Sequence, residues 1–287
     1  MILNIFLLLI SVFAGSTAVI MIKASTVQPF LLASFRLFVA AVVLAPIFSR
    51  DRRKHRAAYT WAHVRASVLP GLALAIHFMS WIVGARMAPT ANASFIVNLV
   101  PLVMPFFLAA LIQEHLTRKE ILATVVALCG VIFLTAADLN LSTQYFWGDV
   151  VCFGSMLFYA LYLTLGRKNR HFPTVWLYLV PLYFTAGVFS FMVSLFFVNP
   201  FHPYAPGDVW LILGLGIIPT VIGHSLVNYA MKHFRGQIVS IVNMGQFVFA
   251  GMMGYVFFSE LPHWTFYVAS LLLIASAWIA IQGRHED

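Results

Sequence analysis

Neutral polar side chains recur at helical spacing inside long apolar runs of this chain. His77 and Trp81 are four residues apart and so share one helical face, and Ser94 and Asn98 have the same spacing. We predict that such residues line a binding site; the candidates are His77, Trp81, Ser94, Asn98, Tyr159, His224, Asn228, Asn243 and Gln246. Their chemistry is hydrogen bonding and ring contact, which suits a ligand with an apolar body and a few donors and acceptors.

The composition places these helical faces in a membrane. Of 287 residues, 62% are hydrophobic and 9% charged, with a mean hydropathy of +0.92, far from the balance of a soluble domain. Apolar segments long enough to cross ~30 Å of hydrocarbon recur along the whole chain. The sequence therefore predicts an all-α integral membrane protein with ten transmembrane helices. The predicted spans are 2–22, 29–48, 67–86, 91–112, 120–137, 147–166, 175–198, 208–231, 237–258 and 263–282.

Lysine and arginine are distributed unevenly between the two sets of loops that alternate along these spans. The loops on one side of the predicted membrane hold only Lys23 and Arg86, and Arg36 lies within a span. The loops and chain ends on the other side hold Arg50, Arg52, Arg53, Lys54, Arg56, Arg65, Arg118, Lys119, Arg167, Lys168, Arg170, Lys232, Arg235 and Arg284. Because basic loops stay inside, both termini are predicted to be cytoplasmic. The net charge of +8 then reflects short turns beside the headgroups of membrane lipids, not contact with nucleic acid.

The two halves of the chain are similar to each other. At an offset of 145 residues, the Ile-Val-Asn ending at Asn98 superposes on the one ending at Asn243, and Lys23 falls on Lys168. We predict two five-helix repeats, residues 1–140 and 146–285. An odd number of spans in each repeat inserts the two halves in opposite orientations around a central cavity. Inverted repeats of this kind are typical of secondary transporters.

These residues resemble the EamA-type proteins of the drug/metabolite transporter superfamily. The resemblance rests on the segment Arg86-Met-Ala-Pro-Thr-Ala-Asn-Ala-Ser94, followed by Asn98, Pro101, Glu114-His-Leu-Thr117 and Gly130-Val131, with Arg36 as a further match. It covers the whole chain in two copies. The second copy departs from the pattern, with Gln246 near the position of Pro101 and no Ala-Pro at the preceding turn, which leaves equal roles for the two halves open.

The resemblance is strongest to bacterial exporters of aromatic and other neutral amino acids. It implies alternating-access efflux of a small-molecule substrate across the bacterial inner membrane. A multidrug, nucleotide-sugar or other metabolite carrier of the same superfamily is the alternative, and a channel or a membrane-embedded enzyme is an alternative of another class. The sequence sets neither the substrate nor the oligomeric state.

Motifs of membrane enzymes and ATPases are missing from the sequence. It contains no HExxH, GxSxG, paired aspartates or phosphate-cradling loop. The two cysteines, Cys129 and Cys152, are too few for a disulfide framework or a metal set. We therefore expect no enzymatic activity, no cofactor and no metal.

The polar residues inside spans also have structural explanations. Asn, Ser and His side chains hold membrane helices together at ~0.6 kcal/mol per bond, so a single candidate either lines a path or joins two helices. Arg36 either supports a broken helix or binds a substrate carboxylate. All nine acidic residues fall in loops or at span ends, which favours facilitated transport without ion coupling, although His77 and His224 could titrate.

Overall fold

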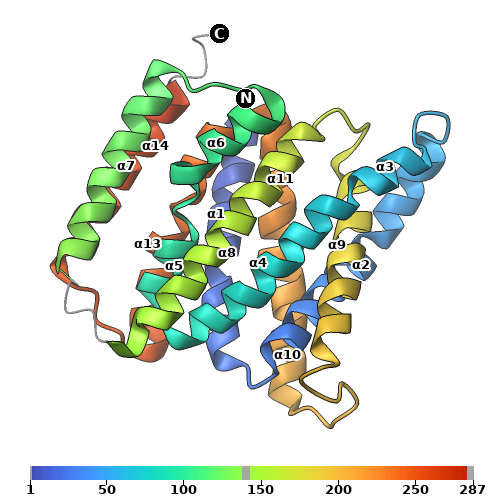
Figure 1. The fold of residues 1–287 in the computed structure, drawn as a ribbon, viewed down its shortest axis with the longest axis horizontal. Helices are drawn as coiled ribbons and strands as arrows, with labels where there is room; N and C mark the ends of the chain where they lie inside the picture. The colour runs from blue at the N-terminus through green and yellow to red at the C-terminus, as the bar shows by residue number, and fades with distance from the viewer. Residues whose placement is uncertain (1, 138–142, 283–287) are drawn as a thin grey trace.

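The computed structural model describes residues 2–137 and 143–282, and every regular element in these ranges is a helix (Figure 1). In chain order the helices are α1 (Ile2–Ala24), α2 (Pro29–Lys54), α3 (Trp61–Ala66), α4 (Val68–Met87), α5 (Thr90–Val97), α6 (Val100–Ile112), α7 (Arg118–Ala137), α8 (Thr143–Lys168), α9 (Val175–Ser194), α10 (Pro206–Leu215), the π-helix η1 (Gly216–His224), α11 (Ser225–His233), α12 (Gly236–Asn243), α13 (Gln246–Phe258) and α14 (Trp264–Gln282).

Nine helical segments within the described ranges are long and apolar enough to cross a membrane. A helix satisfies its own backbone hydrogen bonds, which hydrocarbon cannot do. Several segments combine two or three helices, such as α5 with α6 and α12 with α13. The predicted fifth span, 120–137, is helical as α7 but is not among the nine. Its crossing of the membrane stays a prediction.

Two of the predicted spans are broken in the middle. The span 91–112 divides into α5 and α6 at Asn98 and Leu99, and the span 237–258 divides into α12 and α13 at Met244 and Gly245. Pro101 explains the first break, because it lacks the N–H that a continuous helix would bond. The breaks leave both asparagines of the repeat, Asn98 and Asn243, at the ends of half-helices.

A third irregularity lies in the span 208–231, where the middle turns form η1. Pro219 lies inside this π-helix, and the hydroxyl of Thr220 donates to the carbonyl of Leu215 at 2.7 Å. A π-helical segment is uncommon and is frequent at functional sites. Pro219 is therefore accommodated within a wider helical turn.

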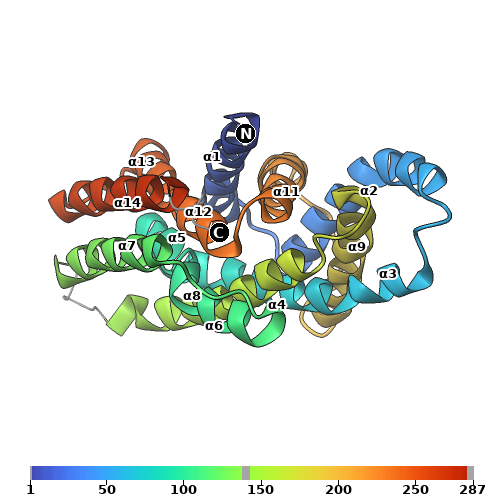
Figure 2. The same cartoon turned by 90° about the horizontal axis from the view of Figure 1, so that it is seen from above.

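The two halves are interleaved. α8 packs along α4 and α6, whereas α1 packs along η1, α11 and α13. Since α1 and α8 correspond in the repeat, the first helix of each half packs against the third and fourth spans of the other half. α2 pairs with α9 on one side of the bundle and α7 with α14 on the other, with α1 and α8 between them (Figures 1 and 2).

Glycine permits the close contact between α4 and α8. A Cβ atom on Gly84 of α4 would lie 2.6 Å from the sulfur of Cys152 and 3.0 Å from the carbonyl oxygen of Gly148, both on α8. Small residues of this kind let membrane helices approach each other. The tight α4–α8 contact positions the side chains of both helices around the centre of the bundle.

Candidate functional site

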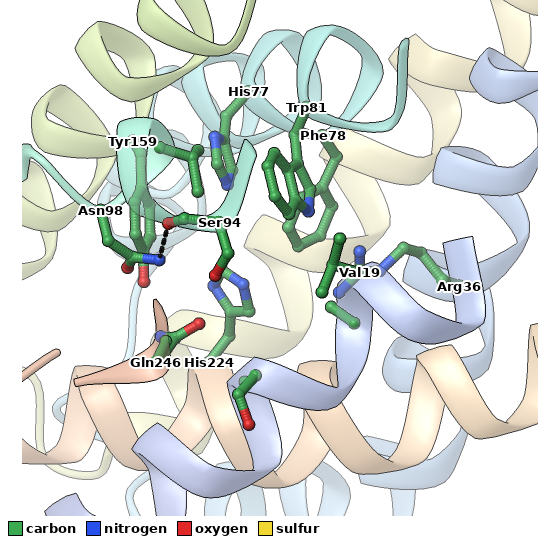
Figure 3. Close-up of a pocket in the computed structure, with 14 residues that line it drawn as sticks. Val19, Arg36, His77, Phe78, Trp81, Ser94, Asn98, Tyr159, His224 and Gln246 are labelled. Atoms are coloured by element: carbon green, nitrogen blue, oxygen red, sulfur yellow. Dashed lines mark hydrogen bonds between the residues drawn. The ribbon is translucent and has the colours of Figure 1, made fainter. Parts of the chain in front are cut away.

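A small cavity lies at the centre of the bundle, where α1, α2, α4, α5, α8, η1 and α13 meet (Figure 3). It leaves about 20 Å³ for the centre of a water-sized sphere, which is room for about one water molecule. The lining residues are Gly15, Ser16, Ala18, Val19, Arg36, His77, Phe78, Trp81, Ser94, Val97, Asn98, Tyr159, His224 and Gln246. The cavity is therefore too small for an amino acid in this conformation.

The two repeat asparagines meet beside this cavity. The amide nitrogen of Asn243 donates to the side-chain oxygen of Asn98 at 3.1 Å and to the hydroxyl of Tyr159 at 3.0 Å. Gln246 in turn donates to the side-chain oxygen of Asn243 at 2.6 Å, and Asn98 donates to the carbonyl of Ser94 at 2.8 Å. This amide network joins the two helix breaks, one from each half of the chain.

Aromatic rings form a second wall. The His77 ring stacks on Tyr159 with centroids 4.5 Å apart and an interplanar angle of 11°. His224 meets Phe78 edge to face at 4.9 Å, and Trp81 completes the wall (Figure 3). Such a surface is apolar but carries nitrogen atoms at its edges, so it suits a flat or aliphatic group with a polar end.

Arg36 is the one arginine or lysine among the described residues that line the cavity. Its guanidinium donates from Nε and Nη2 to the Thr220 hydroxyl at 3.0 and 2.9 Å, and it lies 3.8 Å from the centre of the Phe78 ring. Figure 3 shows the guanidinium reaching from α2 toward the cavity beside Val19. The side chain thus fastens α2 to η1 and still faces the cavity.

The loops meet in two groups, one at each end of the bundle. We call the end with Glu114, Arg167 and Arg235 the basic end, and the end with Lys23 and Glu260 the opposite end. At the basic end, Glu114 of the first half accepts from Arg167 Nε and from the backbone N–H of Gly236, each at 2.9 Å. Gly236 begins α12, so the carboxylate lies at the positive N-terminus of a half-helix in the other half.

The opposite end repeats this arrangement with the halves exchanged. Glu260 of the second half accepts from Lys23 at 2.9 Å and from the backbone N–H of Thr90, the first residue of α5, at 2.8 Å. Each glutamate also follows a residue in the left-handed region: Gln113 has φ 57° and Ser259 has φ 54°. We call these two sites the Glu114 latch and the Glu260 latch.

Additional contacts reinforce both ends. At the basic end Arg235 pairs with Glu120 at 2.8 Å. At the opposite end Arg86 donates to the carbonyl of Ser25 at 2.8 Å, and Asp208 accepts from the Ser25 hydroxyl at 2.7 Å. Polar contacts between the two halves are therefore present at both ends of the bundle.

A family model matches the chain twice. The EamA-like transporter family matches residues 1–136 and again residues 146–282. The chain belongs to the EamA-like transporter family. Such proteins are membrane transporters and not enzymes, so the chain is a multi-pass membrane protein that moves a small molecule.

Two similar chains from Archaeoglobus fulgidus (strain ATCC 49558 / DSM 4304 / JCM 9628 / NBRC 100126 / VC-16) are each described as "Uncharacterized transporter". One is 25% identical over 203 residues, which is 70% of this chain and 70% of the relative. The other is 21% identical over 281 residues, which is 96% of this chain and 95% of the relative. A solved structure described as "Crystal structure of protein" matches with a TM-score of 0.77 over 99% of both chains at 16% identity, which shows a shared fold.

In this EamA-like transporter, seven of the nine candidate residues line the central cavity: His77, Trp81, Ser94, Asn98, Tyr159, His224 and Gln246. Asn243 lies behind them and bonds three polar groups near the cavity wall. Asn228 is placed differently from the expectation, because its amide donates to the His224 carbonyl and the Tyr162 hydroxyl and so joins α11 to α8.

The sequence analysis missed the part of the lining that α1 contributes. Gly15, Ser16 and Ala18 belong to the run Gly15-Ser-Thr-Ala18, whose small side chains allow close contact. A Cβ atom on Gly15 would lie 2.7 Å from the side chain of Gln246. A cluster of small residues inside an apolar span is the signal that marks this helix as part of the wall.

Proposed function

We propose that the chain exports small neutral and aromatic amino acids, or related metabolites, from the cytoplasm across a bacterial inner membrane by alternating access. In this proposal ten spans form two inverted five-helix repeats, residues 1–140 and 146–285, with both termini in the cytoplasm. The candidate residues bind the substrate between the repeats.

The hydrogen bond between Asn98 and Asn243 carries this proposal. The two residues are separated by 145 positions and lie at equivalent breaks of the two repeats. Discontinuous helices at a repeat interface are where secondary transporters bind their substrates, because the broken turns expose backbone groups to a polar ligand. A substrate between the two breaks contacts both halves, so movement of one half against the other changes its access.

The two latches are equivalent closures, one at each end of the bundle, with the roles of the two halves exchanged. Opening the Glu260 latch exposes the cavity at the opposite end, which is external in the proposed topology, and opening the Glu114 latch exposes it to the cytoplasm. Each latch joins one half to the other. The cavity of about 20 Å³ must widen before it holds an amino acid, which supports a closed state between the two open ones.

The wall chemistry favours an amphipathic substrate. Its described members are amide, hydroxyl, imidazole, aromatic and small apolar side chains together with one guanidinium. The rings of Trp81, Phe78 and Tyr159 offer area to an apolar body, and the amide network offers donors and acceptors. Transport down the gradient of the substrate, without ion coupling, is the mode that we propose.

Counterflow in proteoliposomes tests the proposal. Vesicles loaded with unlabelled phenylalanine should accumulate external labelled phenylalanine transiently, and unlabelled threonine or methionine should compete. An imposed pH or sodium gradient, with the voltage clamped, should change the initial rate by less than about twofold. Strong acceleration by either gradient would overturn the uncoupled mode, and a single-channel current would indicate a pore instead of a carrier.

A further inference from the structure

Arg36 is a buried cation with unused hydrogen-bonding capacity. Its side chain is 0% exposed, and its Nε and Nη2 hydrogen bonds both end on the Thr220 hydroxyl. The remaining terminal nitrogen, Nη1, is buried and has no partner among the described residues. Because a guanidinium carries five N–H donors, this nitrogen is free to bind an acceptor from the cavity that it borders.

The charge of Arg36 also has no carboxylate beside it. The ion pairs that the structure shows within residues 2–137 and 143–282 involve Asp51, Glu114, Glu120 and Glu260, which lie at the ends of the bundle. The Phe78 ring 3.8 Å away supplies only the weaker attraction of a π face. A charge in a low-dielectric interior interacts strongly with any counter-charge that enters.

A second polar atom faces the same region. His224 Nδ1 is buried without a hydrogen-bond partner among the described residues, and the His224 ring lies 4.9 Å from the Phe78 ring that Arg36 covers. The rings of Trp81 and Phe78 lie next to these nitrogens (Figure 3). The arrangement therefore places two buried polar nitrogen atoms beside an apolar surface of rings.

We propose that Arg36 Nη1 binds the carboxylate of the substrate and that this carboxylate is the polar group the cavity requires. The inference rests on the proposed transport function and specifies its substrate class as small carboxylates with an apolar body. The described lining holds amides, hydroxyls and rings where an ammonium group would lie, and no carboxylate. An α-amino group is then accepted but not required, so desamino acids are also ligands.

The test compares four probes that share one phenyl ring. Purified protein in nanodiscs is titrated with phenylalanine, 3-phenylpropanoate, phenylalaninamide and 2-phenylethylamine, and binding is measured by calorimetry. We expect the two carboxylates to bind and the amide and the amine to bind about 10-fold to 100-fold more weakly, the range of a hydrogen bond to a charged group. This comparison needs no substitution and therefore no assumption about folding.

The variant Arg36→Gln should abolish the preference for carboxylates, and it should not weaken binding of the amine, because removing a buried cation relieves its repulsion of an ammonium group. Arg50→Gln is its matched control, because Arg50 lies on the same helix but its side chain is 80% exposed at the basic end. Equal affinity of phenylalanine and phenylalaninamide for the wild-type protein would overturn the inference and leave the amino-acid proposal standing. Binding of 3-phenylpropanoate without phenylalanine would support the inference and overturn the amino-acid proposal, and failure of all four probes to bind would overturn both.

Discussion

Opening of the Glu260 latch and of the Glu114 latch should have opposite effects on access to the cavity. Glu260→Gln removes the ion pair with Lys23 and weakens the carboxylate contact at the N-terminus of α5. Glu114→Gln removes the equivalent ion pair with Arg167 and weakens the contact at the N-terminus of α12. Each substitution is isosteric, so the helix packing stays intact.

The size of the effect follows from the exposure of each pair. The side chains of Lys23 and Glu260 are 16% and 32% exposed, so the pair contributes about 0.2–1 kcal/mol and the helix-terminal carboxylate about 0.3–1 kcal/mol. Loss of both shifts the equilibrium by roughly 0.5–2 kcal/mol, a factor of about 2–30. The side chains of Arg167 and Glu114 are only 9% and 12% exposed, so Glu114→Gln should have the larger effect.

Thiol labelling at a cavity position measures this shift. Ser94→Cys, in a background with Cys129→Ser and Cys152→Ala, places one thiol on the cavity wall. A membrane-impermeant methanethiosulfonate applied to intact cells should label the Glu260→Gln variant faster than its parent, and applied to inverted vesicles it should label the Glu114→Gln variant faster. Faster labelling from the same side in both variants, or a change below about twofold in both, would refute the two-latch reasoning.

Three other substitutions test the cavity and the packing around it. Asn243→Leu leaves the Asn98 oxygen and the Tyr159 hydroxyl without this donor and Gln246 without its acceptor, at about 1–3 kcal/mol for each buried group left unpaired. It should lower the melting temperature and reduce counterflow at least tenfold, and unchanged counterflow would contradict a role for the amide network. Gly84→Val should destabilise the fold, because the Cβ atom of the new side chain would lie within 3.0 Å of atoms in α8. Gly154→Val should not, because nothing lies within 4 Å of a Cβ atom at that position. Equal melting temperatures of the two variants would argue against the close α4–α8 contact. Trp81→Ala should reduce growth in the presence of toxic amino-acid analogues without lowering the amount of protein in the membrane. Trp210→Ala, at a residue that is 74% exposed, should leave growth unchanged. Normal tolerance in both variants would place the substrate elsewhere.

Hydropathy and the repeat were sufficient to predict the broad architecture. Apolar runs of the necessary length predicted a helical membrane protein, because only a helix satisfies its own backbone within hydrocarbon. The offset of 145 residues between Asn98 and Asn243 predicted equivalent positions in two halves. The sequence did not predict the hydrogen bond between these two amides, because that bond depends on how the half-helices of the two repeats pack against each other.

The helix breaks were harder to predict than the helices. The sequence stays apolar through Leu99 and Met244, so hydropathy gives no sign that the helix is interrupted at either residue. Pro101 offered a local signal for the first break, but the second copy has no proline at this point, and its break lies beside Gly245. The break in the second half had to be inferred from the repeat, which assumes that the halves share their backbone.

Side-chain direction separates Asn228 from the other candidates. Asn228 follows His224 by four residues and shares its helical face, yet its amide turns toward the Tyr162 hydroxyl of α8. Spacing along one helix gives the face but not the neighbour that occupies it. For the same reason the sequence left two roles open for Arg36, whereas the structure shows it both bonded to η1 and facing the cavity.

Because the two halves are interleaved, α1 is synthesised long before the second-half helices that it packs against. α1 ends at Ala24 and its partner η1 begins at Gly216, so at a synthesis rate of about 5–20 residues per second the newly made α1 waits roughly 10–40 s for its partner. During that interval the small and hydroxyl-bearing face around Gly15 and Ser16 is without its final neighbours. Until then α1 can pack only against first-half helices such as α4 and α5, which it also contacts in the folded protein.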